Sequence, residues 1–226
     1  DAARDANAIG PRNLAASARQ VGARLIHFST DFVFDGTRSR PYRPADSPNP
    51  LSVYGTTKLE GEHAVLEEAR ELGIVLRTSW VFSPFGRNFV RTMLRLFGNG
   101  DPVRVVSDQV GSPSSARDLA RVVWSLVGSD FRNSPRGRVL HVANSGLCSW
   151  YDFAVAVGEI GVEQGLLSAM PSITPILTED YPTPAARPSN SVLETSETWE
   201  VIGYRLPHWR SALREALKEM ADVADA

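Results

Sequence analysis

The sequence predicts an α/β fold, a Rossmann-like doubly wound sheet of mostly parallel strands with helices on both faces. Three short, almost continuous apolar runs, at 24–29, 74–78 and 139–142, suit strands that are covered on both sides. Longer segments with apolar residues at helical spacing separate these runs. Strands that alternate with helices in this way are typical of a parallel sheet.

In the first half of the chain, helices are expected over 4–21 and 52–72, each followed by a strand. The apolar residues of the first helix are Ile9, Leu14, Ala18 and Val21, and those of the second are Leu59, Val65, Leu66 and Ala69. Gly22 and Gly73 are suitable helix stops. The polar segment 38–50, with four prolines, is expected to be a loop between them.

In the second half, helices are expected over 89–97, from 115 onward, over 149–160 and over 207–220, with strands at 103–106 and 173–177. Ser149 is expected to cap the third of these helices, with Asp152 in its first turn at the positive end of the helix dipole. After about Gly137 the loops are richer in Pro and Ser. We therefore expect a partial Rossmann-like catalytic domain at 1–137 and a smaller substrate-binding region at 138–226, interwoven with it.

Composition narrows the class of protein. The 226 residues carry a net charge of −2, with 24 basic and 26 acidic residues well mixed, so no basic stripe points to nucleic acid. No apolar run approaches the ~18 residues of a membrane span. The one cysteine, Cys148, excludes an internal disulfide and suits a reducing, cytoplasmic setting. The four histidines show no metal-ligand spacing, and His27 and His141 are expected to be satisfied core residues.

The stretch from Ser29 to Lys58 carries the strongest chemical signal. Ser29 and Thr30 end a predicted strand, and Tyr54 and Lys58 lie one turn apart on the helix that follows. A free tyrosine has a pKa of about 10, and a nearby ammonium stabilises the phenolate. Such a pair can pass a proton to a carbonyl oxygen that Thr30 or Ser29 holds. The alternative is an ordinary surface Tyr and Lys.

Several runs resemble the dTDP-4-dehydrorhamnose reductases, members of the extended short-chain dehydrogenase/reductase superfamily. They are FSTDFVFDG at 28–36, NPLSVYGTTKLEGE at 49–62, LRTSWVF at 76–82, NFVRTML at 88–94, DQVGSP at 108–113, ARPSNSVL at 186–193 and RLPHWR at 205–210. Their order along the chain is that of the family. Phe32 departs from the pattern, because the family usually has tyrosine there.

The resemblance implies reduction of the 4-keto group of a dTDP-sugar by NADPH or NADH, with Thr30, Tyr54 and Lys58 as the catalytic residues. It implies cofactor contacts at Phe28, Ser29, Tyr54, Lys58 and Trp80. It implies substrate contacts at Thr30, Asp31, Trp80, Asn88, Gln109, Arg187 and Asn190. Three of these residues also have a purely structural interpretation. The alternative for Trp80 is a core aromatic residue, for Asp31 it is a turn cap, and for Arg187 it is a surface ion pair.

A Gly-rich turn that holds the cofactor pyrophosphate is expected in such an enzyme, and no G-x-x-G-x-x-G run follows a predicted strand here. By the resemblance, the expectation is that the first strands of the nucleotide domain are missing and that this chain alone binds the cofactor poorly. Three points stay open: whether the cofactor is NADPH or NADH, whether a Mg²⁺ ion binds, and whether the protein forms a homodimer. So do two other functions: a related nucleotide-sugar epimerase or dehydratase, and a non-catalytic subunit like the regulatory β-subunit of methionine adenosyltransferase.

Overall fold

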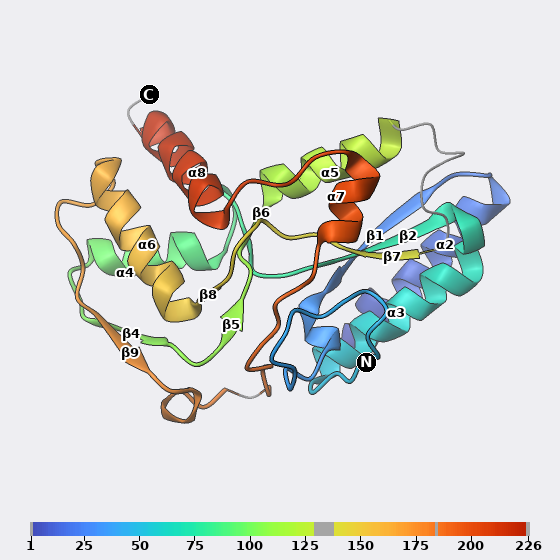
Figure 1. The fold of residues 1–226 in the computed structure, drawn as a ribbon, viewed down its shortest axis with the longest axis horizontal. Coiled ribbons are helices and arrows are strands. Elements are labelled where there is room, and N and C mark those ends of the chain that lie inside the picture. The colour runs from blue at the N-terminus through green and yellow to red at the C-terminus, as the bar shows by residue number, and fades with distance from the viewer. Residues whose placement is uncertain (1, 129–137, 184, 225–226) are drawn as a thin grey trace. The chain divides into compact units, whose positions relative to one another are not determined.

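The computed structural model describes residues 2–128, 138–183 and 185–224 (Figure 1). The chain forms two compact units, each made of three segments. The first unit consists of Asp1–Ser79, Ala120–Val142 and Pro184–Arg205. The second consists of Trp80–Leu119, Ala143–Thr183 and Leu206–Ala226. The division expected from the sequence, 1–137 and 138–226, stays a proposal.

A three-stranded parallel sheet forms the centre of the first unit, in the order β1-β2-β7. Its strands are β1 (Leu25–Thr30), β2 (Gly73–Thr78) and β7 (Arg138–His141). Every residue of β2 is buried, as its continuous apolar run predicts. The register aligns Ser29 with Arg77 and Thr30 with Thr78, so the polar C-terminal ends of β1 and β2 lie side by side at the same end of the sheet.

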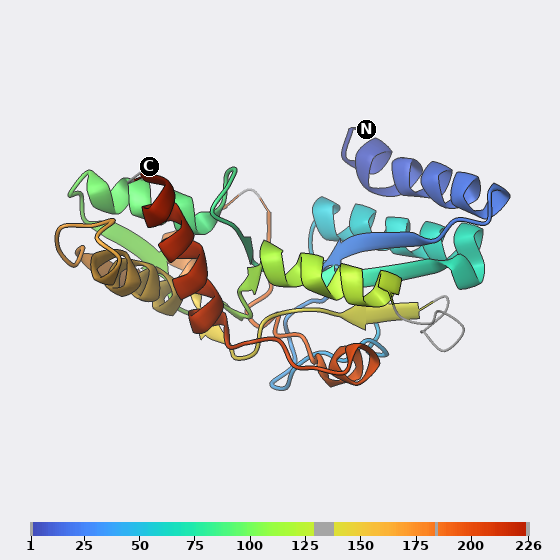
Figure 2. The same cartoon turned by 90° about the horizontal axis from the view of Figure 1, so that it is seen from above.

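Helices α2 and α3 lie side by side next to β1 and β2 in both views (Figures 1 and 2). The helical elements of this unit are α1 (Ala2–Arg4), η1 (Asp5–Ile9), α2 (Gly10–Gln20), η2 (Asp31–Val33), α3 (Val53–Ala69), η3 (Arg70–Leu72) and α7 (Ser196–Ile202). Ala15 of α2 and Val65 and Ala69 of α3 pack with Val75 of β2 in one buried cluster.

The predicted apolar face of the first helix is wrong. Ile9, Leu14 and Val21 are exposed, whereas Ala8 and Ala15 are buried. The cause is the close approach of α3, where a Cβ added to Gly61 would lie 2.1 Å from the carbonyl oxygen of Asn7. So short a distance leaves room only for small side chains between the helices.

The second unit has a hydrophobic core of its own, to which three of its helices contribute. Its elements are β3 (Val81–Phe82), α4 (Phe89–Gly98), β4 (Val103–Val106), β5 (Val110–Gly111), β6 (Ser114–Ser115), β8 (Cys148–Ser149), α6 (Trp150–Glu163), β9 (Ile173–Ile176), η4 (Thr178–Asp180) and α8 (Trp209–Ala224). Strands β3–β6 and β4–β9 pair in parallel, and β5–β8 antiparallel. The core includes Phe82, Val90, Phe153, Ile160 and Leu213.

Most predicted elements are present. Ser149 caps α6 as expected: its hydroxyl accepts from Asp152 N at 3.0 Å, and its own N–H donates to the Asp152 carboxylate at 3.0 Å. Helix α5 (Ala116–Gly128) buries Leu119, Val122 and Leu126. The short helix α7 was not predicted. Among the described residues, no helix combines the length and apolar character that crossing a bilayer requires.

Candidate active site

Thr30 ends strand β1 and directs the chain into η2. Its hydroxyl accepts a hydrogen bond from Phe32 N at 3.1 Å and donates to Asp31 Oδ1 at 3.1 Å. Asp31 is 2% exposed, and burial raises the pKa of its carboxyl to about 6, although the hydroxyls of Ser191 and Thr30 act in the opposite direction. A neutral form of Asp31 is therefore accessible close to physiological pH.

Helix α3 begins next to this strand end. Ser52 caps it by accepting from Gly55 N at 3.2 Å, which places Tyr54 and Lys58 in its first two turns. A Cβ added to Gly55 would lie 2.2 Å from the Phe32 carbonyl oxygen. Only glycine fits there, and the contact fixes the start of α3 against η2.

Lys58 points at strand β1, where its Nζ donates to the Phe28 carbonyl oxygen at 2.6 Å. Burial lowers the pKa of Lys58, and the Glu62 carboxylate raises it. The pKa of Tyr54 is raised, first by burial and also by Asp31, while a hydrogen bond with Thr30 lowers it. The structure thus brings Thr30 and Tyr54 together, and it places Lys58 one turn further along α3 with its ammonium on the backbone of β1.

Two further polar residues, not singled out from the sequence, lie beside these groups. Glu62 of α3 and Arg77 of β2 form a bidentate ion pair, with Arg77 Nη2 and Nε 2.6 and 2.9 Å from the two carboxylate oxygens. The two side chains are 1% and 4% exposed. Ser29 Oγ also donates to Glu62, at 2.5 Å. The spacing of four residues between Lys58 and Glu62 puts both on one face of α3 and could have singled out Glu62, but it does not indicate Arg77 as the partner.

The Phe32 ring flanks Tyr54. The Phe32 ring meets the Tyr54 ring edge-on, with centroids 6.0 Å apart and planes at 79°. Phe28 is 40% exposed and Tyr54 is 47% exposed, so both rings reach the surface of this unit. Half-exposed aromatic rings beside a buried carboxyl and an ammonium are suited to a ligand that is partly apolar and partly polar.

Trp80, which belongs to the second unit, has an unusual backbone. Its φ is +47°, a region that bulky side chains rarely adopt. Its indole stacks on that of Trp150, with centroids 3.6 Å apart and planes at 9°. A Cβ added to Gly111 would lie 2.5 Å from the Trp80 ring, so the backbone of this glycine also lies against the indole. The indole is therefore packed against both a ring and a glycine backbone.

Asn88 and Gln109, also in the second unit, each have partners within it. Asn88 caps α4 by accepting from Arg91 N at 3.2 Å, and it donates to the carbonyl oxygen of Ser83 at 2.8 Å. Gln109 is 5% exposed and donates to Thr178 Oγ1 at 3.1 Å. These bonds hold the loops that carry the two residues.

In the first unit, Asn190 donates to the Arg38 carbonyl oxygen at 2.9 Å and accepts from Val192 N at 3.2 Å, so it ties two loops together. The nearby Arg187 has an exposed side chain. It stays a prediction that the substrate contacts Asn88, Gln109, Arg187 and Asn190.

The two strand histidines differ from the expectation of satisfied core residues. Burial lowers the pKa of His27 to about 4 and that of His141 to about 3. His141 Nδ1 lies 3.0 Å from the Tyr42 carbonyl oxygen, but the Nε2 atoms of both residues are buried without a hydrogen-bond partner. Within the described ranges, no three His, Cys, Asp or Glu side chains are grouped as a metal ion would require.

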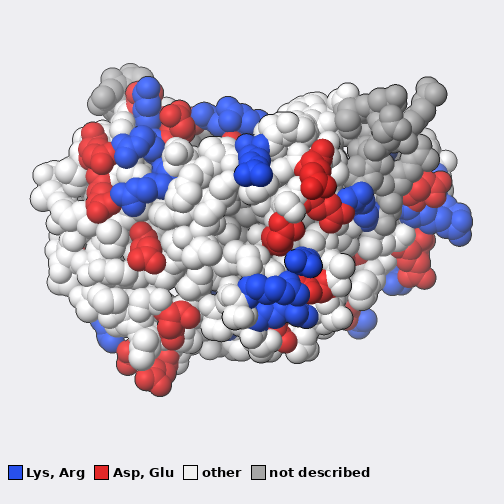
Figure 3. Space-filling view, viewed as in Figure 1, with Lys and Arg blue, Asp and Glu red and all other residues white. Residues whose placement is uncertain are grey.

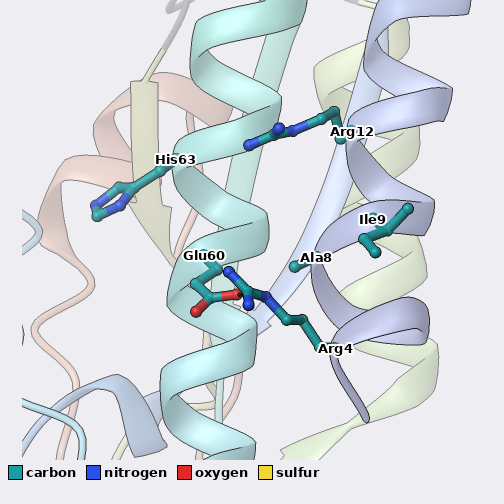
Figure 4. Close-up of a pocket in the computed structure, with 6 residues that line it drawn as sticks. All are labelled: Arg4, Ala8, Ile9, Arg12, Glu60 and His63. Atoms are coloured by element: carbon teal, nitrogen blue, oxygen red, sulfur yellow. Dashed lines mark hydrogen bonds and ion pairs between the residues drawn. The ribbon is translucent and has the colours of Figure 1, made fainter. Parts of the chain in front are cut away.

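A surface groove of about 440 Å³ lies elsewhere on the first unit, between η1, α2 and α3 (Figure 4). An ion pair between Arg4 and Glu60, 2.9 Å long, runs along it, and His63 points away from the other lining residues. Figure 3 shows basic and acidic side chains interspersed over the face it presents. Neither feature marks a strongly charged ligand site.

Sequence relatives of this chain match nearly all of its length. A dTDP-4-dehydrorhamnose reductase of Mycobacterium tuberculosis is 44% identical over 223 residues, covering 96% of this chain and 69% of the relative. The Bacillus subtilis spore coat polysaccharide biosynthesis protein SpsK is 42% identical, covering 97% of this chain and 72% of the relative. The comparisons confirm the family of oxidoreductases expected from the sequence motifs.

Solved structures confirm the Rossmann-like α/β fold. A dTDP-4-dehydrorhamnose reductase of Bacillus anthracis, in complex with NADP, superposes with a TM-score of 0.85 at 33% identity, covering 96% of this chain and 74% of that one. The structure of the Clostridium acetobutylicum orthologue superposes with a TM-score of 0.84 at 39% identity, covering 97% of this chain and 72% of that one. The model of the RmlD substrate binding domain matches residues 1–222, and this chain belongs to that family.

Proposed function

We propose that this chain carries the proton-transfer centre of a reductase that converts dTDP-4-dehydrorhamnose to dTDP-L-rhamnose. The observation that carries the proposal is the meeting of Thr30, Tyr54 and Lys58 at the end of β1. Relatives of this chain at 37–44% identity are named for that reaction. The substrate of this reaction is a nucleotide sugar, and we expect neither nucleic acid nor a membrane as a partner.

The residues fit a nicotinamide cofactor, and the NADP complex of the relative at 33% identity supports NADPH. Lys58 donates one of its three N–H groups to Phe28 O, so an ammonium at this place has others to offer a ribose hydroxyl. When bound, the nicotinamide supplies a hydride to the sugar C4. No described cluster supports a Mg²⁺ ion.

The chain's own residues handle the proton. Thr30 Oγ1 and the Tyr54 hydroxyl orient the 4-keto oxygen between them. The raised pKa of Tyr54 keeps the phenol protonated at neutral pH, which is the form that donates a proton to the oxygen as the hydride arrives. The Lys58 ammonium then stabilises the phenolate that remains.

The test is NADPH oxidation by the protein as it is made in the cell, with dTDP-4-dehydrorhamnose as substrate. Tyr54→Phe is expected to lower kcat by at least about 100-fold, because it removes the general acid. Tyr181→Phe, at an exposed tyrosine of the second unit, is the matched control and should leave kcat unchanged. A folded protein that oxidises no NADPH but binds a partner enzyme would favour the regulatory alternative.

Two finer expectations remain proposals. A homodimer, which the family resemblance leaves open, would show as twice the monomer mass in light scattering. A cytoplasmic location would show in cell fractionation as recovery with cytoplasmic marker enzymes.

A further inference from the structure

Glu62 is the most deeply buried carboxylate near the proposed site. It is 1% exposed and lies one helical turn beyond Lys58 on α3. A charge in such a place is unfavourable unless it is fully paired. Three donors from two strands satisfy it: Ser29 Oγ at 2.5 Å, Arg77 Nε at 2.9 Å and Arg77 Nη2 at 2.6 Å.

The strand register places these donors directly before the reacting groups. Ser29 pairs with Arg77, and the next pair is Thr30 with Thr78. Glu62 therefore joins α3 to both strands one residue away from Thr30. We propose that Glu62 is a positioning residue for the reductase site, holding the helix that carries Tyr54 and Lys58 in a fixed place against Thr30. The inference rests on the proposed function, because it names the residues of that site.

The charges around Lys58 give Glu62 a second effect. Lys58 interacts electrostatically with Glu62 of its own helix and with His27 of β1, and Tyr54 lies one helical turn before it. Arg77 of β2 pairs with the same Glu62 carboxylate. Burial lowers the pKa of Lys58, and the Glu62 carboxylate opposes this. Removing that negative charge while Arg77 stays positive should make Lys58 lose its proton at a lower pH.

The experiment measures turnover and the Lys58 titration together. This sequence has two lysines, Lys58 and the exposed Lys218, so amine NMR of lysine-labelled protein gives an internal control, and Lys58→Arg identifies the signal. For Glu62→Gln we expect kcat to fall by about 10- to 100-fold. We also expect the Lys58 midpoint to fall by about one pH unit or more, with Lys218 unchanged.

Glu62→Gln leaves Arg77 buried without its ion-pair partner and so destabilises the fold. Two further variants separate this from positioning. Glu62→Gln/Arg77→Gln leaves no buried ion unpaired, and it should recover thermal stability but not kcat. Ser29→Ala keeps both charges and removes the bond to β1, and it should lower kcat several-fold while the Lys58 midpoint stays at its wild-type value.

The inference is overturned if the double variant regains wild-type kcat, or if Glu62→Gln changes stability alone. Either result would make Glu62 a residue of the fold and nothing more. Failure of the proposed function is recognised separately, because the wild-type protein would then show no turnover of the keto sugar. The pH midpoint of the Lys58 titration needs no substrate, so it would still report whether the Glu62 charge acts on Lys58.

Discussion

Asp31→Asn should stabilise the protein in a way that depends on pH. Burial raises the pKa of the Asp31 carboxyl from 3.8 to about 6, so the folded state binds its proton more tightly than the unfolded chain does. For a raised carboxyl pKa, stability falls as pH rises through the window between the two values. At about 1.4 kcal/mol per tenfold change in affinity, the ionised carboxylate costs about 3 kcal/mol above pH 7. The amide cannot ionise, and its oxygen still accepts from Thr30.

The assay is urea unfolding of wild type and Asp31→Asn at pH 5 and pH 8. We expect the variant to be more stable by about 3 kcal/mol at pH 8 and by roughly half of that at pH 5. Asp35→Asn is the matched control with the opposite sign, because hydrogen bonds from Asn49, Thr37 and Tyr42 lower the Asp35 pKa. A stability difference for Asp31→Asn that is the same at both pH values would refute the reasoning.

Three other substitutions test separate features. Gly111→Ala should push Trp80 off its stack and raise KM for the nucleotide sugar, since the new Cβ would lie 2.5 Å from the indole; unchanged tryptophan fluorescence and KM would contradict this. Ser149→Ala should destabilise the second unit by about 0.5–2 kcal/mol in thermal unfolding through loss of the α6 cap, with no pH dependence between 7 and 9. Phe32→Tyr should leave stability within about 0.5 kcal/mol and, by restoring the hydroxyl usual in the family, lower KM rather than change kcat.

The local parts of the site could be predicted from the sequence. A strand that ends in Ser-Thr and a Tyr and a Lys four residues apart are patterns within a few residues, so periodicity places them. The same holds for the Ser149 cap. The Glu62–Arg77 pair joins a residue of α3 to a residue of β2, and only the packing of this helix on the sheet brings the two side chains together.

The errors have physical causes too. Large apolar residues were expected to form the buried face of the first helix, but Gly61 draws α3 so close that alanines do so. The direction of the Tyr54 pKa also lay beyond the sequence. Burial is the first cause that raises this pKa, and burial depends on the whole fold rather than on spacing along a helix. The stabilisation of the phenolate by Lys58 stays a prediction.

The backbone of Trp80 has a consequence for how this protein can evolve. A tryptophan held at φ +47° stores about 1–3 kcal/mol of strain in the native state. Glycine would release that strain, because it adopts positive φ readily. Substitutions that make this position more stable thus remove the indole that stacks on Trp150, and selection for stability alone would erode the ring pair.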